Sequence, residues 1–265
     1  MKNKKTLSRV YLILIMAFFY LPIVYVVLFS FNASRSLTNF TGFSLRWYEK
    51  MFKTRAMMES IYYSLVIAVL ATLISTVVGT IVAIGLSKSG KIIKQLVTQV
   101  NNLPMLNPDI VTAIGLMLFF STLNIPTGFT TLLLAHITFC IPYVMLSVTP
   151  KLRQLDDNLA EAAMDLGCTP FQALYKVIIP QIKEGILSGA LVAFTMSFDD
   201  FVISYFTTGP GINNISTYVY ATTKRINPSV NALSTLIVLA MTIVLILTNV
   251  VPLLRERGKK NEEVN

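Results

Sequence analysis

Long apolar runs and short polar connections alternate along this chain of 265 residues. A helix needs about 20 mostly apolar residues to cross a bilayer. Runs of that length predict an all-α, polytopic membrane protein with six transmembrane helices, near residues 10–31, 61–86, 103–123, 129–150, 186–206 and 232–254. No internal repeat and no appended soluble segment is evident, so we expect a single transmembrane domain over residues 1–265.

Two of these runs have features that refine the prediction. The first, residues 10–31, exceeds the roughly 7–15 apolar residues of a signal-peptide core, so we expect it to remain as an uncleaved span. The third begins with Pro104 and Pro108, which predict an irregular first turn because proline cannot donate a backbone hydrogen bond. Irregular backbone at membrane depth must be sheltered by protein or by water.

Composition agrees with a membrane location. Hydrophobic residues make up 54% of the chain and charged residues only 13%, whereas soluble domains carry about 25% charged residues. The net charge of +9 comes mostly from residues that flank the apolar runs, where they can anchor the chain to anionic lipid. No aromatic and basic motif for RNA or DNA is present, so no nucleic-acid partner is expected.

Cysteine and histidine usage limits the chemistry. Cys140 lies in an apolar run and Cys168 in a polar loop, so a disulfide framework is not expected. The single histidine, His136, excludes a site built from several histidines. Two interpretations of His136 stay open: a polar residue facing the interior of the bundle, or a member of a proton relay.

A partial phosphate-binding motif does not predict a nucleotide site. Residues Gly85–Lys91 match most of such a loop, but Ile92 stands where a serine or threonine should hold magnesium. The segment also follows a membrane helix, where the motif needs a strand. We therefore read it as a helix end with basic anchors and expect no cofactor in this chain.

The distribution of lysine and arginine predicts the orientation. Of the 22 basic residues, 15 fall on the side that holds both termini and the connections after the second and fourth runs. Cytoplasmic loops carry the excess of basic residues. Both termini are therefore expected in the cytoplasm.

Small residues recur at helical spacing in two of the runs. This spacing lets helices approach closely where lipid provides no hydrophobic driving force. We expect such close contacts in the second and fifth runs, at Ser75, Gly79 and Ala83 and at Gly185, Gly189 and Ala193.

The loop over residues 151–185 predicts two short amphipathic helices. In the first, apolar positions share one face, and Gly167 is placed to end the helix. Thr169 and Pro170 then form the N-cap and first position of the second, which Pro180 is expected to interrupt. The apolar face of the first helix comprises Leu159, Ala162, Ala163 and Leu166.

These residues carry a family resemblance. Glu161-Ala162-Ala163 is followed at fixed intervals by Gly167, then by Val177, Ile179 and Pro180. The pattern resembles the EAA loop of bacterial ABC-importer permeases, in which isoleucine and leucine stand at the positions of Val177 and Ile179. The stretch from Ser197 to Gly211 is similar to the spermidine/putrescine branch of that family.

The resemblance implies a transport permease without catalytic activity of its own. Its expected partners are a second homologous permease, a cytoplasmic ABC ATPase dimer that would bind ATP and magnesium, and an extracytoplasmic polyamine-binding protein. The implied location is the bacterial inner membrane. The residues implied in coupling to the ATPase are Glu161, Ala162, Ala163, Gly167 and Pro180.

Two adjacent acids, Asp199 and Asp200, interrupt the fifth apolar run. Because an ionised carboxylate at the centre of a membrane helix costs roughly 2.5–3.5 kcal/mol, such acids face a wet cavity or a partner and mark ion or substrate pathways. A polyamine is a chain of positive charges that carboxylates and aromatic faces would bind. The candidates for the substrate path are Asp199, Asp200, Asp109, Trp47 and Ser197.

Three of these candidates have an equally simple structural interpretation. Adjacent helical residues point about 100° apart, so one of Asp199 and Asp200 can face a neighbouring helix instead of the path. Asp109 can cap the helix that it begins. Trp47, the only tryptophan, can act as an anchor at the membrane interface.

Other functions remain open at this stage. Within the same family, the alternatives are importers of iron, thiamine or phosphonate. A cation channel or carrier acting alone would also use intramembrane carboxylates, but it has no need of an ATPase-docking loop. An intramembrane aspartyl protease is disfavoured, because adjacent acids on one helix cannot share a proton across a site.

Overall fold

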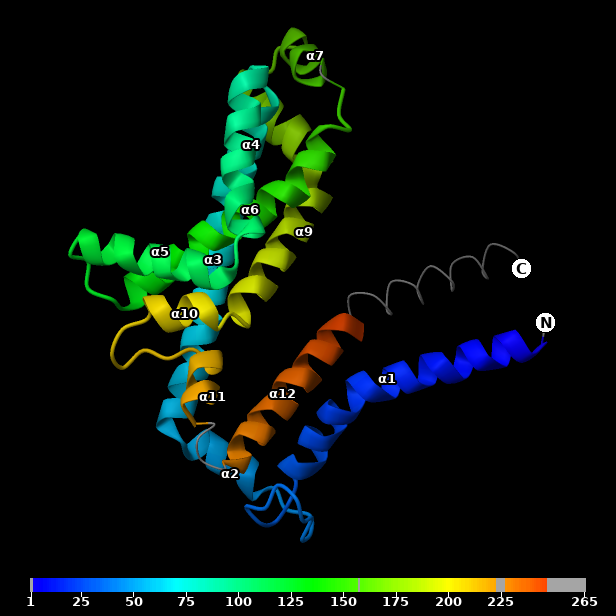
Figure 1. Cartoon of the computed structure of the whole chain (residues 1–265). Helices are drawn as coiled ribbons and strands as arrows, with labels where there is room; N and C mark the ends of the chain where they lie inside the picture. Colours follow the sequence, from blue (N-terminus) through cyan, green and yellow to red (C-terminus); the bar gives the residue numbers. More distant parts are fainter. Residues whose placement is uncertain (1, 157, 223–226, 247–265) are drawn as a thin grey trace. The chain divides into compact units, whose positions relative to one another are not determined.

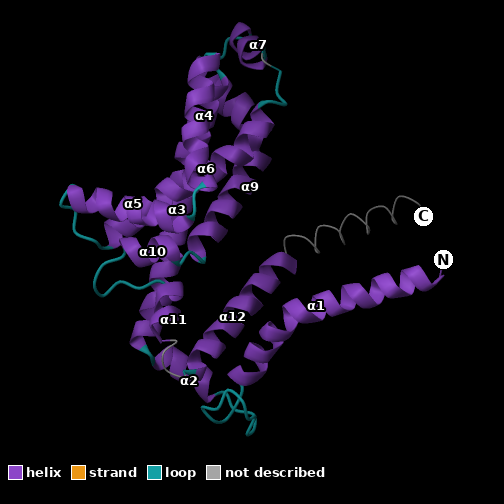
Figure 2. Ribbon diagram, in the orientation of Figure 1, coloured by secondary structure: helices purple, strands orange, loops and turns teal. Residues whose placement is uncertain are grey.

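The computed structural model describes residues 2–156, 158–222 and 227–246. These residues form helices and connecting loops without a β-strand, apart from an isolated bridge between Asn32 and Phe43 (Figures 1 and 2). The chain divides into two compact units, one from residues 1–58 and 219–265 and the other from residues 59–218. The all-α prediction is confirmed for the described residues.

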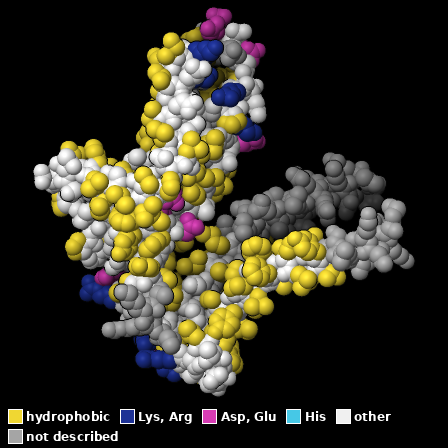
Figure 3. Space-filling model, viewed as in Figure 1, with side chains coloured by type: hydrophobic (Ala, Val, Ile, Leu, Met, Phe, Trp, Pro, Cys, Tyr) yellow, Lys and Arg dark blue, Asp and Glu magenta, His cyan; other side chains and the backbone are white. Residues whose placement is uncertain are grey.

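The first unit contains α1 (Lys2–Ser30), α2 (Arg46–Lys53) and α12 (Pro228–Leu245). α12 packs against both α1 and α2 (Figure 1). The residues Arg9–Ser30 of α1 are apolar and long enough to cross a bilayer, and none of the most apolar 18-residue window is buried inside the protein. Hydrophobic side chains cover much of the described surface of α1 that is visible in Figure 3. Such a surface suits lipid or another membrane protein.

The loop between α1 and α2 is folded around Asn32. Its buried amide group donates to the carbonyl oxygens of Ser36 and Asn39 and accepts a hydrogen bond from the backbone of Thr41. The indole of Trp47 donates to the backbone oxygen of Asn32 at 2.6 Å. Trp47 therefore ties α2 to this loop.

The second unit begins within α3 (Arg55–Ser87) and is centred on α6 (Phe129–Leu152). The principal contact of α6 is with α9 (Ile179–Phe198). Around them lie α4 (Lys91–Leu106), α5 (Asp109–Thr122) and α10 (Val202–Thr207), and the unit ends within α11 (Ile215–Thr222) (Figure 2).

The small residues predicted to allow close packing do so around Val144 of α6. A Cβ added to Gly79 of α3 would lie 2.9 Å from the Val144 Cβ, and one added to Gly189 of α9 would lie 3.1 Å from the Val144 Cα. A Cβ at Gly185 would lie 2.8 Å from Lys151 Cγ. α6 thus packs between glycines from two other helices, which confirms that expectation.

The spans differ in part from the sequence prediction. Four helices are long and apolar enough to cross a membrane, over Arg9–Ser30, Arg55–Ser87, Phe129–Leu152 and Pro170–Phe198. A fifth arises if α4 and α5, which meet at an angle of 108°, count as one bent span. The sixth run is represented by the shorter apolar helix Pro228–Ile243, and residues 247–254 of it lie outside the described part of the chain. The count of six spans therefore stays a prediction.

The third run is irregular near its start, as expected, at the second of its two prolines. Pro104 lies inside α4, and the chain bends at Asn107 and Pro108 instead. A residue before proline is forced out of the helical region, and Asn107 accordingly adopts φ −82° and ψ 148°.

The fifth run is not the single helix over 186–206 that its hydrophobicity predicts. α9 ends at Phe198 and α10 begins at Val202. The interruption falls on the two aspartates. A carboxylate at this position can accept hydrogen bonds from the free N–H groups at the start of the next helix, whereas in a continuous helix those N–H groups would already be bonded to backbone carbonyls.

The loop before α9 forms the first predicted helix, α7 (Leu159–Asp165), which ends as expected at Gly167. Gly167 has φ +90°, and its N–H and that of Cys168 donate to the carbonyl oxygens of Met164 and Ala163. This pattern is a Schellman motif, in which a glycine in the left-handed region closes a helix.

The second helix differs from the prediction at Pro180. Thr169 caps α8 (Pro170–Ala173) as expected, but the chain then continues through a π-helical turn, Leu174–Ile178, directly into α9. Pro180 lies in the first turn of α9 and does not interrupt the helix. The wider π turn accommodates a proline that lacks an N–H and would otherwise clash with the preceding turn.

Candidate functional site

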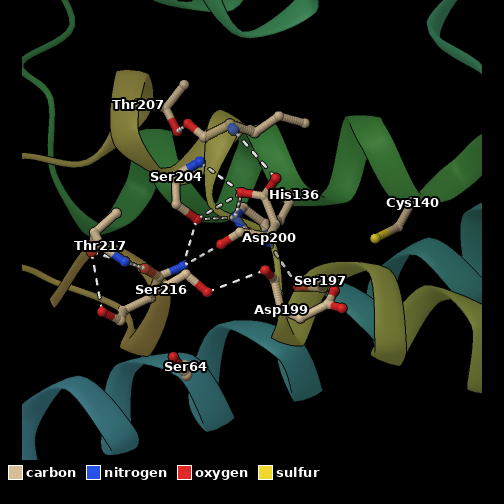
Figure 4. A network of polar contacts seen from close by, with 12 residues as sticks. Ser64, His136, Cys140, Ser197, Asp199, Asp200, Ser204, Thr207, Ser216 and Thr217 are labelled. Carbon is tan, nitrogen blue, oxygen red and sulfur yellow. Dashed lines mark hydrogen bonds and ion pairs between the residues drawn. The ribbon is translucent and has the colours of Figure 1, made fainter. Parts of the chain in front are cut away.

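The helix break between α9 and α10 gathers the polar groups of the 59–218 unit (Figure 4). Asp200 lies just before α10 and satisfies its first free N–H groups. Its Oδ1 accepts a hydrogen bond from the Ile203 amide at 3.2 Å, and its Oδ2 accepts from the Ser204 amide at 2.7 Å and from the Ser204 hydroxyl at 2.8 Å. This carboxylate therefore holds the start of α10 in place.

His136 joins three helices at the same point. It projects from α6 and is buried, with Nδ1 2.7 Å from the Ser197 hydroxyl of α9 and Nε2 2.9 Å from the Ser204 hydroxyl of α10. Its Nε2 also lies 3.6 Å from Asp200 Oδ2. The structure thus agrees with a histidine that faces the bundle interior, while a proton relay stays a hypothesis.

The hydrogen-bond pattern assigns the proton of a neutral His136. Ser204 donates its only hydroxyl proton to Asp200, and it accepts from the side-chain amide of Asn214 at 2.7 Å. Its second lone pair then accepts from His136 Nε2–H, which leaves Nδ1 to accept from Ser197. Every polar group of the cluster has a partner in this arrangement.

Asn214 closes the cluster on its remaining side. Its side-chain amide also donates to the backbone oxygen of Asp200 at 2.9 Å, and its Oδ1 accepts from the Thr217 amide at 2.9 Å. Ser64 of α3 accepts a hydrogen bond from the Ile215 amide at 2.7 Å. Ser204 and Asn214 were not predicted from the sequence as members of this site. Their only signal was that they are polar residues close to the aspartates.

Asp199 is placed differently from its neighbour. Its backbone oxygen accepts from the Ser216 hydroxyl at 3.1 Å, but its exposed carboxylate makes no hydrogen bond or ion pair with another described residue. Aromatic pairs lie on both sides of the break: Phe194 stacks on Phe198, and Phe201 contacts the half-exposed Tyr205. An exposed, uncompensated carboxylate between aromatic residues is suited to a cationic ligand.

The remaining candidates for the path lie in different surroundings. Ser197 is buried and belongs to the His136 cluster. Asp109 is the exposed first residue of α5, a helix that packs against α10. It makes no capping hydrogen bond, since the N-cap position is occupied by Pro108, but an acid in the first turn is favourable to the helix dipole. Among the described residues, Asp109 makes no hydrogen bond or ion pair with the cluster of Asp200.

Trp47 lies in the other unit and is 1% exposed. The guanidinium of Arg46 lies 4.5 Å and the ammonium of Lys50 5.6 Å from the centroid of its ring. Protein cations thus already occupy the aromatic surface that a cationic substrate would use. This arrangement is that of a buried anchor for the loop between α1 and α2.

The loop over residues 151–185, which the resemblance implies in coupling and which is called the coupling loop below, exposes much of its apolar surface. Of the residues implied by the resemblance, Glu161, Ala162 and Gly167 are exposed, while Ala163 is buried against the rest of the unit. A cavity of about 180 Å³ lies between this loop and the ends of α3 and α6. The most exposed apolar side chains of the loop are Leu166 at 88%, Phe171 at 75% and Tyr175 at 64%.

An ion pair fixes the end of the loop to α6. Lys151 Nζ lies 2.6 Å from Glu184 Oε2.

Comparison with protein families assigns the chain. Residues 75–254 match the model of the binding-protein-dependent transport system inner membrane component. The chain belongs to this family. It is therefore a multi-pass inner-membrane component of a transport system, as the EAA motif predicted.

Named relatives of this inner membrane component lie in the polyamine branch. The putrescine transport system permease protein PotI of Escherichia coli K12 is 38% identical over 247 residues, which cover 89% of this chain and 86% of PotI. The spermidine/putrescine permease PotC of Haemophilus influenzae is 36% identical, over 91% of this chain and 94% of PotC. PotC of E. coli K12 is 34% identical over 93% of both chains. These relatives confirm the spermidine/putrescine branch that the stretch from Ser197 to Gly211 predicted.

Solved structures agree with the fold. A chain of a bacterial ABC transporter that imports alginate has a TM-score of 0.70 and 15% identity, and the match covers 95% of this chain and 96% of that one. A second structure of an alginate transporter contains a periplasmic protein bound to an alginate pentasaccharide, with a TM-score of 0.67 and 15% identity, over 92% of this chain and 93% of that one. At this identity the comparison establishes the fold alone.

Proposed function

We propose that this inner membrane component is a permease subunit of an ATP-driven importer of polyamines such as spermidine and putrescine. It forms the translocation path with a second, homologous permease. An extracytoplasmic binding protein delivers the substrate, and a cytoplasmic ATPase dimer, with its ATP and magnesium, provides the energy. The chain itself is non-catalytic, and both termini lie in the cytoplasm.

The observation that carries this proposal is the unequal surroundings of the two aspartates. Asp200 has its carboxylate oxygens engaged by the backbone of α10 and by Ser204, so it holds the helix break in place. Asp199 is exposed at the same break, and its carboxylate has no partner among the described residues. Asp199 is thus the acid available to an ammonium group, and Asp200 supports its position.

The nature of the substrate follows from charge and aromatic surface together. A polyamine presents ammonium groups separated by methylene chains, so it is bound best by carboxylates alternating with apolar and aromatic faces. The break offers Asp199 with Phe198 on one side and Phe201 on the other. The relatives named for putrescine and spermidine favour the same substrate class. An anionic substrate such as a phosphonate would meet repulsion at Asp199.

Coupling to the ATPase is supported by the shape of the 151–185 loop. α7 is a short helix closed by Gly167, and it leads into α8 and then without interruption into α9, whose C-terminal end is the helix break. A displacement of this loop is therefore transmitted along one continuous helix to Asp199. The ATPase acts on transport only if its two states bind this loop differently.

The test is reconstitution of the complex in lipid vesicles. The chain is produced with its partner permease and ATPase, and uptake of labelled spermidine is followed with and without ATP. The proposal expects accumulation only when all subunits and ATP are present. Ion flux through the purified chain without the ATPase would instead establish a channel, and uptake of iron or thiamine but no amine would reassign the substrate.

A further inference from the structure

A second cavity, of about 400 Å³, opens in the 59–218 unit at the end that carries the coupling loop. It lies between α4 and the C-terminal ends of α3 and α6. Basic side chains of this unit gather at the same end (Figure 3). Its polar lining comes mainly from one face of α4, together with Arg153 after α6: Lys94, Thr98, Asn101, Asn102 and Arg153.

The helix α4 carries its apolar and polar residues on opposite faces, with the apolar face outward. Ile92, Leu96, Val100 and Leu103 recur at helical spacing and are 74%, 62%, 64% and 52% exposed. The polar face lines the cavity instead. A helix with one apolar and one polar face is suited to a membrane interface, where the apolar face contacts the acyl chains.

The charge of the cavity is not balanced by the described part of the protein. Lys94 and Arg153 both line it, and neither forms an ion pair with a described acid. The C-terminal ends of α3 and α6 contribute about half a negative charge each. Together they offset about one of the two positive charges, so a net positive charge remains. Asp156 lines the neighbouring cavity of about 180 Å³ and not this one.

We propose that this cavity binds the headgroup of an anionic phospholipid. The phosphate lies between Lys94 and Arg153, and the half-buried amides of Asn101 and Asn102 provide hydrogen-bond donors. The acyl chains extend out of the cavity into the lipid that surrounds the exposed apolar face of α4. Basic pockets between membrane helices at the cytoplasmic surface are suited to such lipids. Free phosphate shares the headgroup chemistry, but the exposed apolar face of α4, which is suited to contact with a membrane, favours a lipid.

The lipid stabilises the position of α4 against α6. α4 has no buried residue, and its contact with α6 is small compared with that of α9. Few contacts within this unit therefore hold the polar face of α4 in position. The site is independent of the transported substrate. It would hold equally if the importer carried a different cargo.

The test measures retained lipid in the intact transporter complex by native mass spectrometry after reconstitution in mixed phosphatidylglycerol and phosphatidylcholine. We expect retention of phosphatidylglycerol, and its loss by about tenfold in the double variant Lys94→Gln with Arg153→Gln. The matched control, Lys176→Gln with Lys183→Gln, removes the same charge from the exposed surfaces of the π turn and of α9 and should keep the lipid.

Three outcomes would overturn the proposal. The first is equal retention of phosphatidylcholine by the unaltered complex, a measurement that does not depend on any variant folding. The second is unchanged phosphatidylglycerol in the Lys94 and Arg153 variant. The third is full displacement of the lipid by millimolar inorganic phosphate, which would identify a site for free anions instead.

Discussion

Asp200 and Ser204 are joined twice across the start of α10: the Oδ2 atom accepts both the amide and the hydroxyl hydrogen of Ser204, at 2.7 and 2.8 Å. This pair is the centre of a cluster that reaches α6 through His136 and the loop before α11 through Asn214. The buried carboxylate of Asp200 thus fixes the ends of several helices next to the exposed carboxylate of Asp199.

The first prediction concerns this cluster. Replacing Asp200 by Ala leaves two amides and a hydroxyl without their acceptor, and each buried unsatisfied group costs about 1–3 kcal/mol. We expect Asp200→Ala to lower the thermal stability of the detergent-solubilised protein clearly, whereas Asp199→Ala, at an exposed position, leaves it nearly unchanged. Equal loss of stability in the two variants would contradict the assignment of Asp200 as the supporting residue.

His136 gives a second prediction. His136→Phe keeps the volume of the ring approximately but leaves the hydroxyl of Ser197 without its acceptor and that of Ser204 without a donor. We expect a loss of about 1–3 kcal/mol in stability. His136→Gln, which retains a donor and an acceptor, should recover part of it. A stability of His136→Phe equal to that of the unaltered protein would show that these hydrogen bonds contribute little.

Close packing around Val144 gives a third prediction. Gly189→Val places a side chain where the backbone of α6 lies 3.1 Å from the added Cβ, and overpacking of this kind costs about 1–3 kcal/mol. Gly115→Ala is the matched control, because nothing lies within 4 Å of its added Cβ and the change should be neutral or slightly stabilising. The two variants are compared by thermal unfolding, followed by light scattering. A fully stable Gly189→Val protein would contradict the contact of α6 with α9.

Gly167 gives a fourth prediction. Because its φ is +90°, any residue with a Cβ is strained there by about 1–3 kcal/mol. We expect Gly167→Val to weaken co-purification with the ATPase subunit while α9 and the His136 cluster stay folded. Gly167→Asn, which tolerates the left-handed region better, should retain more of the complex. If Gly167→Val co-purifies with the ATPase subunit as well as the unaltered protein does, this turn does not contribute to binding the ATPase.

Much of the fold follows from local patterns in the sequence. Gly79 and Gly189 stood at small-residue spacing and pack closely against α6, and Gly167 stood where a helix ends and has a left-handed conformation. Each of these features depends on a few neighbouring residues. That is the range over which periodicity and capping operate.

The helix break and its cluster were harder to predict. The apolar run continues through Phe206, so hydrophobicity alone did not reveal that the helix ends at Phe198. Pro180 was expected to interrupt a helix. The π turn before it widens the helix, so the chain continues as a helix although Pro180 has no N–H to donate. Asn214 and Ser204 reach Asp200 only in three dimensions, because the chain folds back over α10. Sequence proximity could not separate the role of Asp199 from that of Asp200.

The most direct test of the central claim is the concentration dependence of labelled spermidine uptake by the reconstituted importer carrying Asp199→Asn. With Glu49→Gln as the control for loss of an exposed carboxylate elsewhere, we predict that Asp199→Asn assembles normally but needs about tenfold more substrate, or loses uptake entirely. Uptake by Asp199→Asn that matches the unaltered importer at every concentration would contradict the role of Asp199 in binding the substrate.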